Sequence, residues 1–325
     1  MNTGSDRQYD FKAGSLEKAL DSFKEKDIRQ FTVYDRQLTS SKDNLIRFMK
    51  AAARKTPDVL FDIHLPHTVI DRQVAETASE LYCSLSVDVP SDWQNQRKPL
   101  EKKCALLNDM GLVFGFDADC SAFDRETFSV KYFRDMLDFL IQQYPNHLYC
   151  SFDGVKAGPR LSTQDITLLK NLAFASDAFY TEGRAVPWFL TVLHPLRLRP
   201  SAFLSDFAEW QRCNNCGPSS GFTLEGASHA ELEKMQLAFL KFKYEEKKMP
   251  HVFPAVEDMV SLQGAYSRAA FEGEETVLDL SYSPDDLFSP FAQDIQKFVD
   301  EVCMEACSIR VYPGEYEPEW APVRN

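Results

Sequence analysis

One pattern occurs five times in the first half of the chain: a short apolar stretch ends in a polar or acidic residue, and a segment with helical periodicity follows. Strands that alternate with helices form a parallel sheet or barrel, and ligands bind at the carboxyl ends of its strands. The repeat therefore predicts an α/β fold with polar side chains at the binding edge. The apolar stretches end within residues 31–35, 61–64, 85–88, 114–119 and 150–153.

The periodicity of these stretches predicts a partial βα barrel over residues 1–155. Along residues 112–119, the apolar Phe114 and Phe116 alternate with glycine and aspartate. One face of such a strand packs under helices, and the other is small and polar, as the lining of an open barrel is. The helices are expected at residues 15–27, 41–55, 71–81, 99–110 and 127–143.

From residue 156 the composition changes, and the pattern predicts a mostly helical extension up to residue 312. Its two strands are expected at residues 276–281 and 308–312, on either side of a helix at 289–303. The last stretch, residues 313–325, is rich in proline and glutamate, which predicts a flexible tail. The other helices are expected at residues 162–179, 185–196, 200–213, 228–248 and 255–271.

The negative charge of the chain limits which partners it can bind. Its formal net charge is −13 and its pI is near 5.0, which argues against nucleic acid or an anionic membrane surface as the main partner. No stretch approaches the roughly 18 apolar residues of a membrane-spanning helix, and residues 1–11 lack the apolar core of a signal peptide. We therefore expect a cytoplasmic protein whose partner is a small molecule.

Six side chains at the strand ends are candidates for a ligand site. In one interpretation, carboxylates accept hydrogen bonds from the hydroxyls or amine of a nucleotide; in another, His64 and carboxylates bind a divalent metal ion. Each aspartate could instead cap the following helix, and His64 could be a core histidine with satisfied hydrogen bonds. The alternation of residues 61–65 directs His64 and Asp62 to one polar face. The six are Asp35, His64, Asp88, Asp117, Asp119 and Asp153.

The chain has eight cysteines, and four of them form two close pairs. Cys213 and Cys216 are spaced as in a zinc or iron–sulfur half-site, and Cys303 and Cys307 would share one face of the expected helix at 289–303. Together the pairs could hold zinc or an auxiliary iron–sulfur cluster, or they could be ordinary thiols. The other four, expected to be small buried side chains, are Cys83, Cys104, Cys120 and Cys150.

The order of the first elements resembles the radical S-adenosylmethionine superfamily, in particular its cobalamin-binding branch. Residues 31–36 and the helix after them look like the family's strand that ends in aspartate. Ser86 and Asp88 stand where the family places a turn near the ribose of its cofactor. Residues 110–117 are similar to the family's glycine-containing strand near the adenine. The resemblance implies a partial barrel with these residues in its pocket.

The second half adds to this resemblance. Residues 161–166 and 179–184 resemble a helical extension that some cobalamin-type members carry, so the resemblance covers most of residues 30–245. It implies S-adenosylmethionine, or a similar nucleoside, as the ligand. The family's defining Cys-x-x-x-Cys-x-x-Cys run, which holds a [4Fe–4S] cluster, does not occur in this sequence. An upstream segment or a partner chain would then supply the first strand of the family's barrel.

Three hypotheses for the function follow. The first is a radical-type protein that is degenerate or truncated at the cluster loop and still binds a nucleoside. The second is a non-catalytic binding or scaffold protein that keeps the barrel for stability. The third is a metal-dependent lyase, isomerase or hydrolase that uses His64 and the strand-end aspartates.

Overall fold

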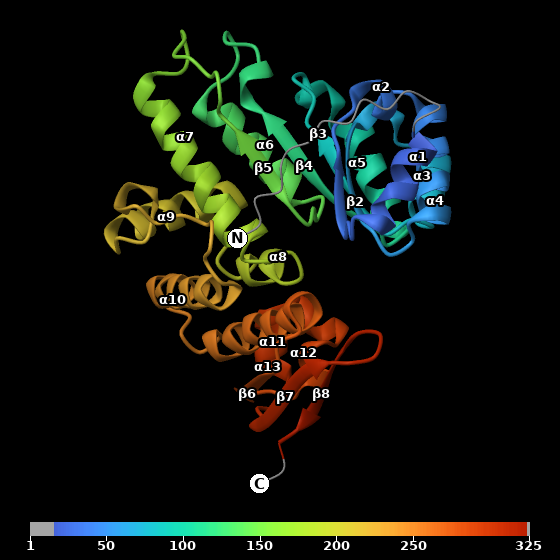
Figure 1. Ribbon diagram of the computed structural model, residues 1–325. Helices are drawn as coiled ribbons and strands as arrows, with labels where there is room; N and C mark the ends of the chain where they lie inside the picture. The colour runs from blue at the N-terminus through green and yellow to red at the C-terminus, as the bar shows by residue number, and fades with distance from the viewer. Residues whose placement is uncertain (1–15, 324–325) are drawn as a thin grey trace. The chain divides into compact units, whose positions relative to one another are not determined.

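The computed structural model describes residues 16–323, and the chain divides into two compact units (Figure 1). Unit 1 contains the residues up to 124 together with 150–155, and unit 2 contains residues 125–149 together with those from 156 onward. Residues 125–149, which the sequence pattern places in the barrel, therefore group with unit 2. The outermost residues of the predicted barrel and tail, 1–15 and 324–325, lie outside the described part.

A five-stranded sheet has its strands in the order β1-β2-β3-β4-β5. The neighbours from β1 to β4 are parallel, with Asp88 of β3 opposite Asp117 of β4. The predicted α/β fold with a parallel sheet is confirmed, whereas the partial barrel stays a prediction because pairing order alone does not define a barrel. The strands are β1 (Gln30–Val33), β2 (Leu60–Pro66), β3 (Cys83–Asp88), β4 (Val113–Asp119) and β5 (Leu148–Ser151).

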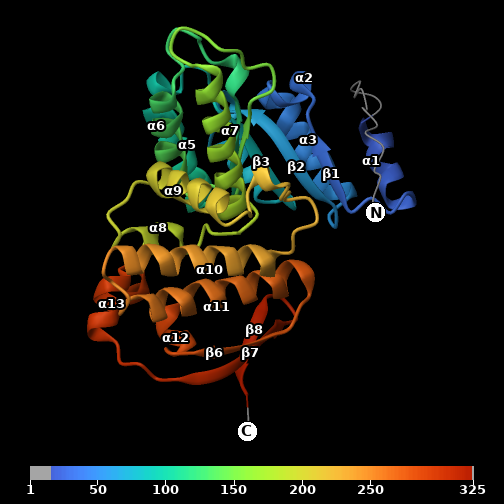
Figure 2. The same ribbon diagram turned by 90° about the vertical axis from the view of Figure 1, so that its left-hand side faces the viewer.

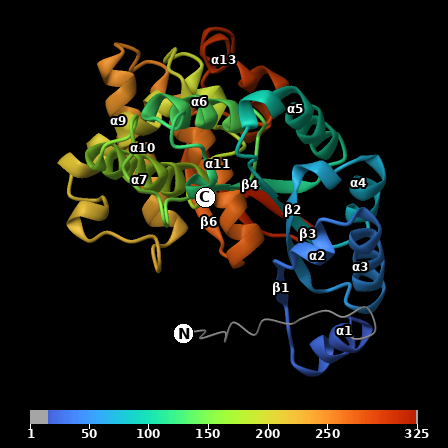
Figure 3. The same cartoon turned by 90° about the horizontal axis from the view of Figure 1, so that it is seen from above.

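In unit 1, helices α3, α4 and α5 lie along one face of this sheet (Figure 3). The alternation of β2 explains this, because Phe61, Ile63 and Leu65 are fully buried while Asp62 and His64 between them are not. Phe48 of α3 packs edge-on against Phe61, with 5.6 Å between ring centroids. The helical elements are α1 (Leu16–Glu25), α2 (Arg36–Thr39), α3 (Lys42–Lys55), η1 (His67–Val69), α4 (Arg72–Ala78), α5 (Trp93–Asp109) and η2 (Cys120–Ala122).

Unit 2 combines helices with an antiparallel sheet in the order β6-β7-β8. Its two longest helices, α10 and α11, lie side by side (Figure 2). The helix predicted at 200–213 coincides with α9, and the two predicted strands correspond to β6 and β7. The elements are α6 (Val130–Ile141), α7 (Thr163–Ser176), η3 (Asp177–Thr181), α8 (Phe189–Leu193), α9 (Pro200–Cys213), η4 (Pro218–Ser220), α10 (His229–Glu246), α11 (Phe253–Glu272), β6 (Thr276–Leu280), α12 (Pro284–Leu287), η5 (Pro290–Gln293), α13 (Ile295–Glu301), β7 (Cys307–Pro313) and β8 (Pro318–Pro322).

Two predicted segments of unit 2 are wrong. The single helix expected at 289–303 is divided into η5 and α13, because Pro290 starts one turn and Asp294 caps the next by accepting from the Lys297 amide. The tail is not flexible throughout, since β8 pairs with β7. A local composition rich in proline and glutamate does not reveal this pairing, which depends on a partner strand from another part of the chain.

A buried ion pair joins α10 and α11. Arg268 Nη1 donates to Glu233 Oε2 at 2.6 Å and lies 3.2 Å from His229 Nδ1. Burial, together with the charges of nearby arginines, lowers the pKa of His229 to about 4, so the neutral ring accepts from Arg268. A Cβ atom at Gly264 would overlap the Glu233 carboxylate, so this close approach requires glycine.

No helix in the described part of the chain combines the length and the apolar composition that crossing a bilayer needs.

Candidate ligand site

The carboxyl ends of four neighbouring strands bring polar side chains together in unit 1. The parallel register places His64 opposite Ser86, and Ser86 opposite Gly115. We call the whole group the sheet-edge cluster: Tyr34, Arg36, Asp62, His64, Ser86, Asp88 and Asp117.

His64 is held between two carboxylates. Its Nε2 lies 3.2 Å from Asp62 Oδ2, and its Nδ1 lies 2.5 Å from Asp117 Oδ2. Burial of the ring opposes protonation, but the hydrogen bonds and charges of Asp117 and Asp62 outweigh it and raise the pKa of His64 to about 9. At neutral pH the ring is therefore an imidazolium that donates from both nitrogens.

The two flanking groups restrict how His64 and Asp62 can move. Ser86 is almost fully buried, and its hydroxyl donates to Asp62 Oδ1 at 2.9 Å, while the other oxygen of Asp62 faces His64. The ring of Tyr34 packs on the imidazole with 4.0 Å between centroids. Both contacts fix the orientation of the imidazolium in the cluster.

Asp88 is held by a second cation. Arg36 Nη2 donates to Asp88 Oδ1 at 2.8 Å, and Arg36 Nη1 contacts the other oxygen, which makes a bidentate pair. The hydrogen bond to Asp88 is the main cause that raises the pKa of Arg36. Arg36 begins α2, shortly after β1 ends at Val33, so the pair connects the segment after the first strand to the third strand.

This arrangement can accept hydrogen bonds from a polar ligand. The cluster contains three carboxylates and, with His64 protonated, two cations. Its formal net charge is therefore negative. Each oxygen of Asp88 and Asp117 has about two acceptor positions, and the pairs described above occupy only some of them. Hydroxyl and amine donors of a ligand are the groups that the remaining positions would bind.

Three of the predicted site aspartates lie outside the cluster. Asp35 caps α2 by accepting from the amides of Gln37 and Leu38, and Asp119 caps η2 through the Ser121 amide. Asp153 is exposed, and its amide donates to Ser151 Oγ. For Asp35 and Asp119, helix capping is therefore the observed role.

The cluster also contains three side chains that were not among the predicted site residues: Tyr34, Arg36 and Asp62. Asp62 had a usable signal, because it precedes His64 by two residues in a strand and so shares its face. Tyr34 and Arg36 had none, since Tyr34 lies between β1 and α2 and Arg36 begins α2, which at four residues is too short to show a periodicity.

The predicted metal ligands in unit 2 do not fit a shared site. Cys303 lies beyond the end of α13, and Cys307 begins β7, so the two do not share a helix face. Cys213 and Cys216 contact Glu209 and the Gln211 carbonyl, respectively. Across residues 16–323, no three His, Cys, Asp or Glu side chains are grouped as metal ligands. The zinc or iron–sulfur site remains a prediction without support from this geometry.

Removing the Ser86 hydroxyl tests how tightly the cluster is held. We expect Ser86→Ala to lower the free energy of unfolding by about 1–2 kcal/mol, because the half-buried Asp62 carboxylate loses the donor that the buried Ser86 hydroxyl supplies. Urea unfolding followed by circular dichroism measures this change. Ser84→Ala, two residues earlier in the same strand and less buried, should change stability by less than about 0.5 kcal/mol. Equal losses in both variants would contradict the role given to Ser86.

Comparison with known proteins identifies no relative of this chain. It matches no protein-family model, no curated protein and no solved structure. The fold and the cluster define the class as an α/β protein with a polar site at the carboxyl edge of a parallel sheet.

Proposed function

We propose that unit 1 binds a nucleoside-type ligand of the S-adenosylmethionine class at the sheet-edge cluster. In this proposal the sheet is the partial barrel of a radical-S-adenosylmethionine-like protein without the cluster loop. The observation that carries the proposal is the convergence of Asp62, Asp88 and Asp117 from three neighbouring strands, each carboxylate already oriented by a cation.

The chemistry of such a ligand suits this set of groups. A ribose presents two neighbouring hydroxyl donors, and the methionine part presents an ammonium group. A carboxylate such as Asp88, fixed by the bidentate Arg36, can accept from a hydroxyl without reorienting. The cluster also has a net negative charge, which favours a ligand whose own charge is positive, as a sulfonium is.

In this proposal the residues of this chain bind and orient the nucleoside-type ligand and have no other role. The sequence contains no Cys-x-x-x-Cys-x-x-Cys run, so no bond cleavage is assigned to the cysteine thiols of this chain. Among the described strands, β1 lies at an edge of the sheet, so an upstream segment or a partner chain that supplies a further strand would add to it there.

The metal-dependent hypothesis has less support from the geometry. A histidine binds a metal ion through the lone pair of a neutral ring. Both nitrogens of His64 are engaged by carboxylates, and the raised pKa keeps both protonated at neutral pH. Metal binding would have to displace a proton and one of these two hydrogen bonds.

Isothermal titration calorimetry with S-adenosylmethionine, S-adenosylhomocysteine and adenosine tests the proposal. We expect saturable binding, weakened by roughly tenfold or more in Asp88→Asn, because a hydrogen bond to a charged group is worth about 1.5–3 kcal/mol. Asp119→Asn changes the same charge at an exposed helix cap and should leave affinity unchanged. Absence of binding by all three ligands would leave the scaffold hypothesis.

A further inference from the structure

The C-terminal part of unit 2 carries most of the negative charge of the chain. Residues 269–323 contain thirteen acidic residues and two basic residues, whereas the whole chain has a net charge of −13. Both basic residues already have a carboxylate partner, because Lys297 Nζ lies 3.8 Å from Glu301 Oε1 and Arg310 Nη1 lies 3.5 Å from Glu275 Oε1. The other carboxylates of this stretch therefore depend on other segments for a cation.

Part of this negative charge surrounds a pair of aromatic rings. The rings of Tyr266 and Phe288 pack edge to face, with 4.9 Å between their centroids. Burial raises the pKa of the Tyr266 hydroxyl, and the negative charges of three carboxylates raise it further. We call the rings and these carboxylates the aromatic–acidic surface: Tyr266 of α11, Asp285 of α12, Phe288, which follows α12, Glu317, which precedes β8, and Glu319 of β8.

The fold brings these residues together from separate parts of the chain. Helix α11 packs against both α12 and β8. The pairing of β7 with β8 places Glu319 opposite Tyr312, whose hydroxyl donates to Glu319 Oε2 at 3.1 Å. Asp285 and Glu317 are exposed, and within residues 16–323 neither forms an ion pair with a lysine or an arginine. Their negative charges are therefore not neutralised by the described residues.

The surface combines this charge with open aromatic area. Phe288 is 42% exposed, while Tyr266 is half-buried beneath it. The face of an aromatic ring attracts an ammonium or guanidinium group that lies within about 6 Å of its centroid. Lysine and arginine side chains join such a cationic head to an apolar stem. Exposed rings with carboxylates beside them match these two side chains.

We propose that the aromatic–acidic surface binds a basic peptide segment of another protein. One lysine or arginine of the segment lies against the Phe288 ring, and Asp285 and Glu317 pair with it and with its basic neighbours. Exposed ion pairs are individually weak, so binding requires several of them together with the ring contact. The excess of negative charge in residues 269–323 also accelerates the encounter with a basic partner.

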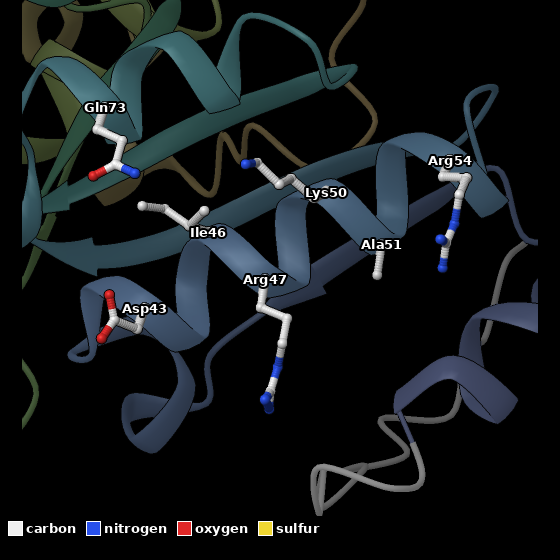
Figure 4. A pocket seen from close by; sticks show the side chains of 7 residues that line it. All are labelled: Asp43, Ile46, Arg47, Lys50, Ala51, Arg54 and Gln73. Atoms are coloured by element: carbon white, nitrogen blue, oxygen red, sulfur yellow. The ribbon is translucent and has the colours of Figure 1, made fainter.

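The basic residues of this chain do not offer a matching patch on a second copy. Helix α3 carries five basic residues and one acidic residue. Around the depression that α3 and Gln73 line, Lys50 points away from Arg47 and Arg54 (Figure 4). These cations do not converge on one surface, so a separate basic chain is the occupant that fits.

Isothermal titration calorimetry of the full chain with two short peptides of equal length tests the proposal. One peptide alternates lysine with serine, and the other alternates glutamate with serine. At physiological ionic strength we expect the lysine peptide to bind saturably and the glutamate peptide not to bind, because the surface attracts only the first.

A matched pair of double variants separates this surface from the general charge of the chain. Asp285→Asn/Glu317→Gln should weaken binding of the lysine peptide by roughly fivefold or more, because two ion pairs are lost. Asp300→Asn/Glu305→Gln removes the same charge from exposed positions on α13 and before β7. It should weaken binding by less than about twofold, because screening limits the effect of distant charges.

A second pair of variants tests the ring contact. Phe288→Ala should weaken binding of the lysine peptide by roughly threefold, as expected for the loss of one exposed cation–π contact. Phe271→Ala removes another exposed ring, at the end of α11, and should leave binding unchanged. Circular dichroism of each variant checks that it is folded.

Several results would overturn the proposal. They are the absence of saturable binding, equal weakening in the two double variants, and equal binding of the glutamate peptide. A dimer that sedimentation detects and that Phe288→Ala abolishes would also overturn it, because a second copy would then occupy the surface. None of these outcomes depends on the sheet-edge cluster.

Discussion

Gly264→Ala is expected to destabilise unit 2 by about 3–5 kcal/mol, the range for breaking a buried ion pair. In the interior of a helix, alanine is normally more favourable than glycine by about 1 kcal/mol. Here the added methyl group would overlap the Glu233 carboxylate, which must then leave Arg268. The sign of the change is therefore opposite to the one that helix propensity alone predicts.

Urea unfolding monitored by tryptophan fluorescence measures this loss, since Trp188 and Trp210 are both in unit 2. The control is the same substitution in a Glu233→Ala background. Without the carboxylate, Gly264→Ala should cost less than about 1 kcal/mol, because the only close neighbour left is Arg268 Nη1, 3.3 Å from the added Cβ, at the end of a side chain that can shift slightly. A full-sized loss in that background would show that the overlap with Glu233 is not the cause.

The second large effect concerns the pH dependence of stability in unit 1. The pKa of His64 is raised from 6.5 to about 9, so the folded state binds this proton more tightly than the unfolded state. The resulting stabilisation is fully present below pH 6.5 and is lost as the pH rises through 9. At about 1.4 kcal/mol per pKa unit, its size is on the order of 3 kcal/mol.

Urea unfolding at intervals between pH 6 and 9.5 should show this decline, and His64→Gln should remove most of it. NMR titration of the imidazole gives the pKa directly. Asp117→Asn should lower that pKa, since Asp117 is the strongest of the groups that raise it. Asp119→Asn, whose side chain caps η2 instead, should leave it unchanged. A titration of His64 near 6.5 in the unmodified chain would contradict the geometry described for it.

The parallel sheet was predictable because strand periodicity is a local property. Phe61, Ile63 and Leu65 alternate with Asp62 and His64, and the burial of β2 follows this alternation. The division of the region at 289–303 into two elements, and the strand at Pro318–Pro322, were not predictable in the same way. They depend on a proline turn and on pairing with β7, which local composition does not encode.

The sequence predicted the site only in part, because a local pattern does not show in which direction each polar side chain points. Asp35 and Asp117 both come after apolar strand residues, yet Asp35 accepts from the amides of the helix that follows it, whereas Asp117, within β4, contacts His64. The two roles share one local pattern. Arg36 is a similar case, because its partner Asp88 is 52 residues away in the sequence.

The sequence by itself determined which residues stand at the carboxyl ends of the strands and which face of each strand is apolar. Both follow from a period of two residues and from the turn that ends each strand. Only the tertiary structure decided that His64 is held between Asp62 and Asp117, and that Asp88 is held by Arg36. These contacts depend on the register between strands that are distant in the chain, and register is set when the helices and the sheet pack together.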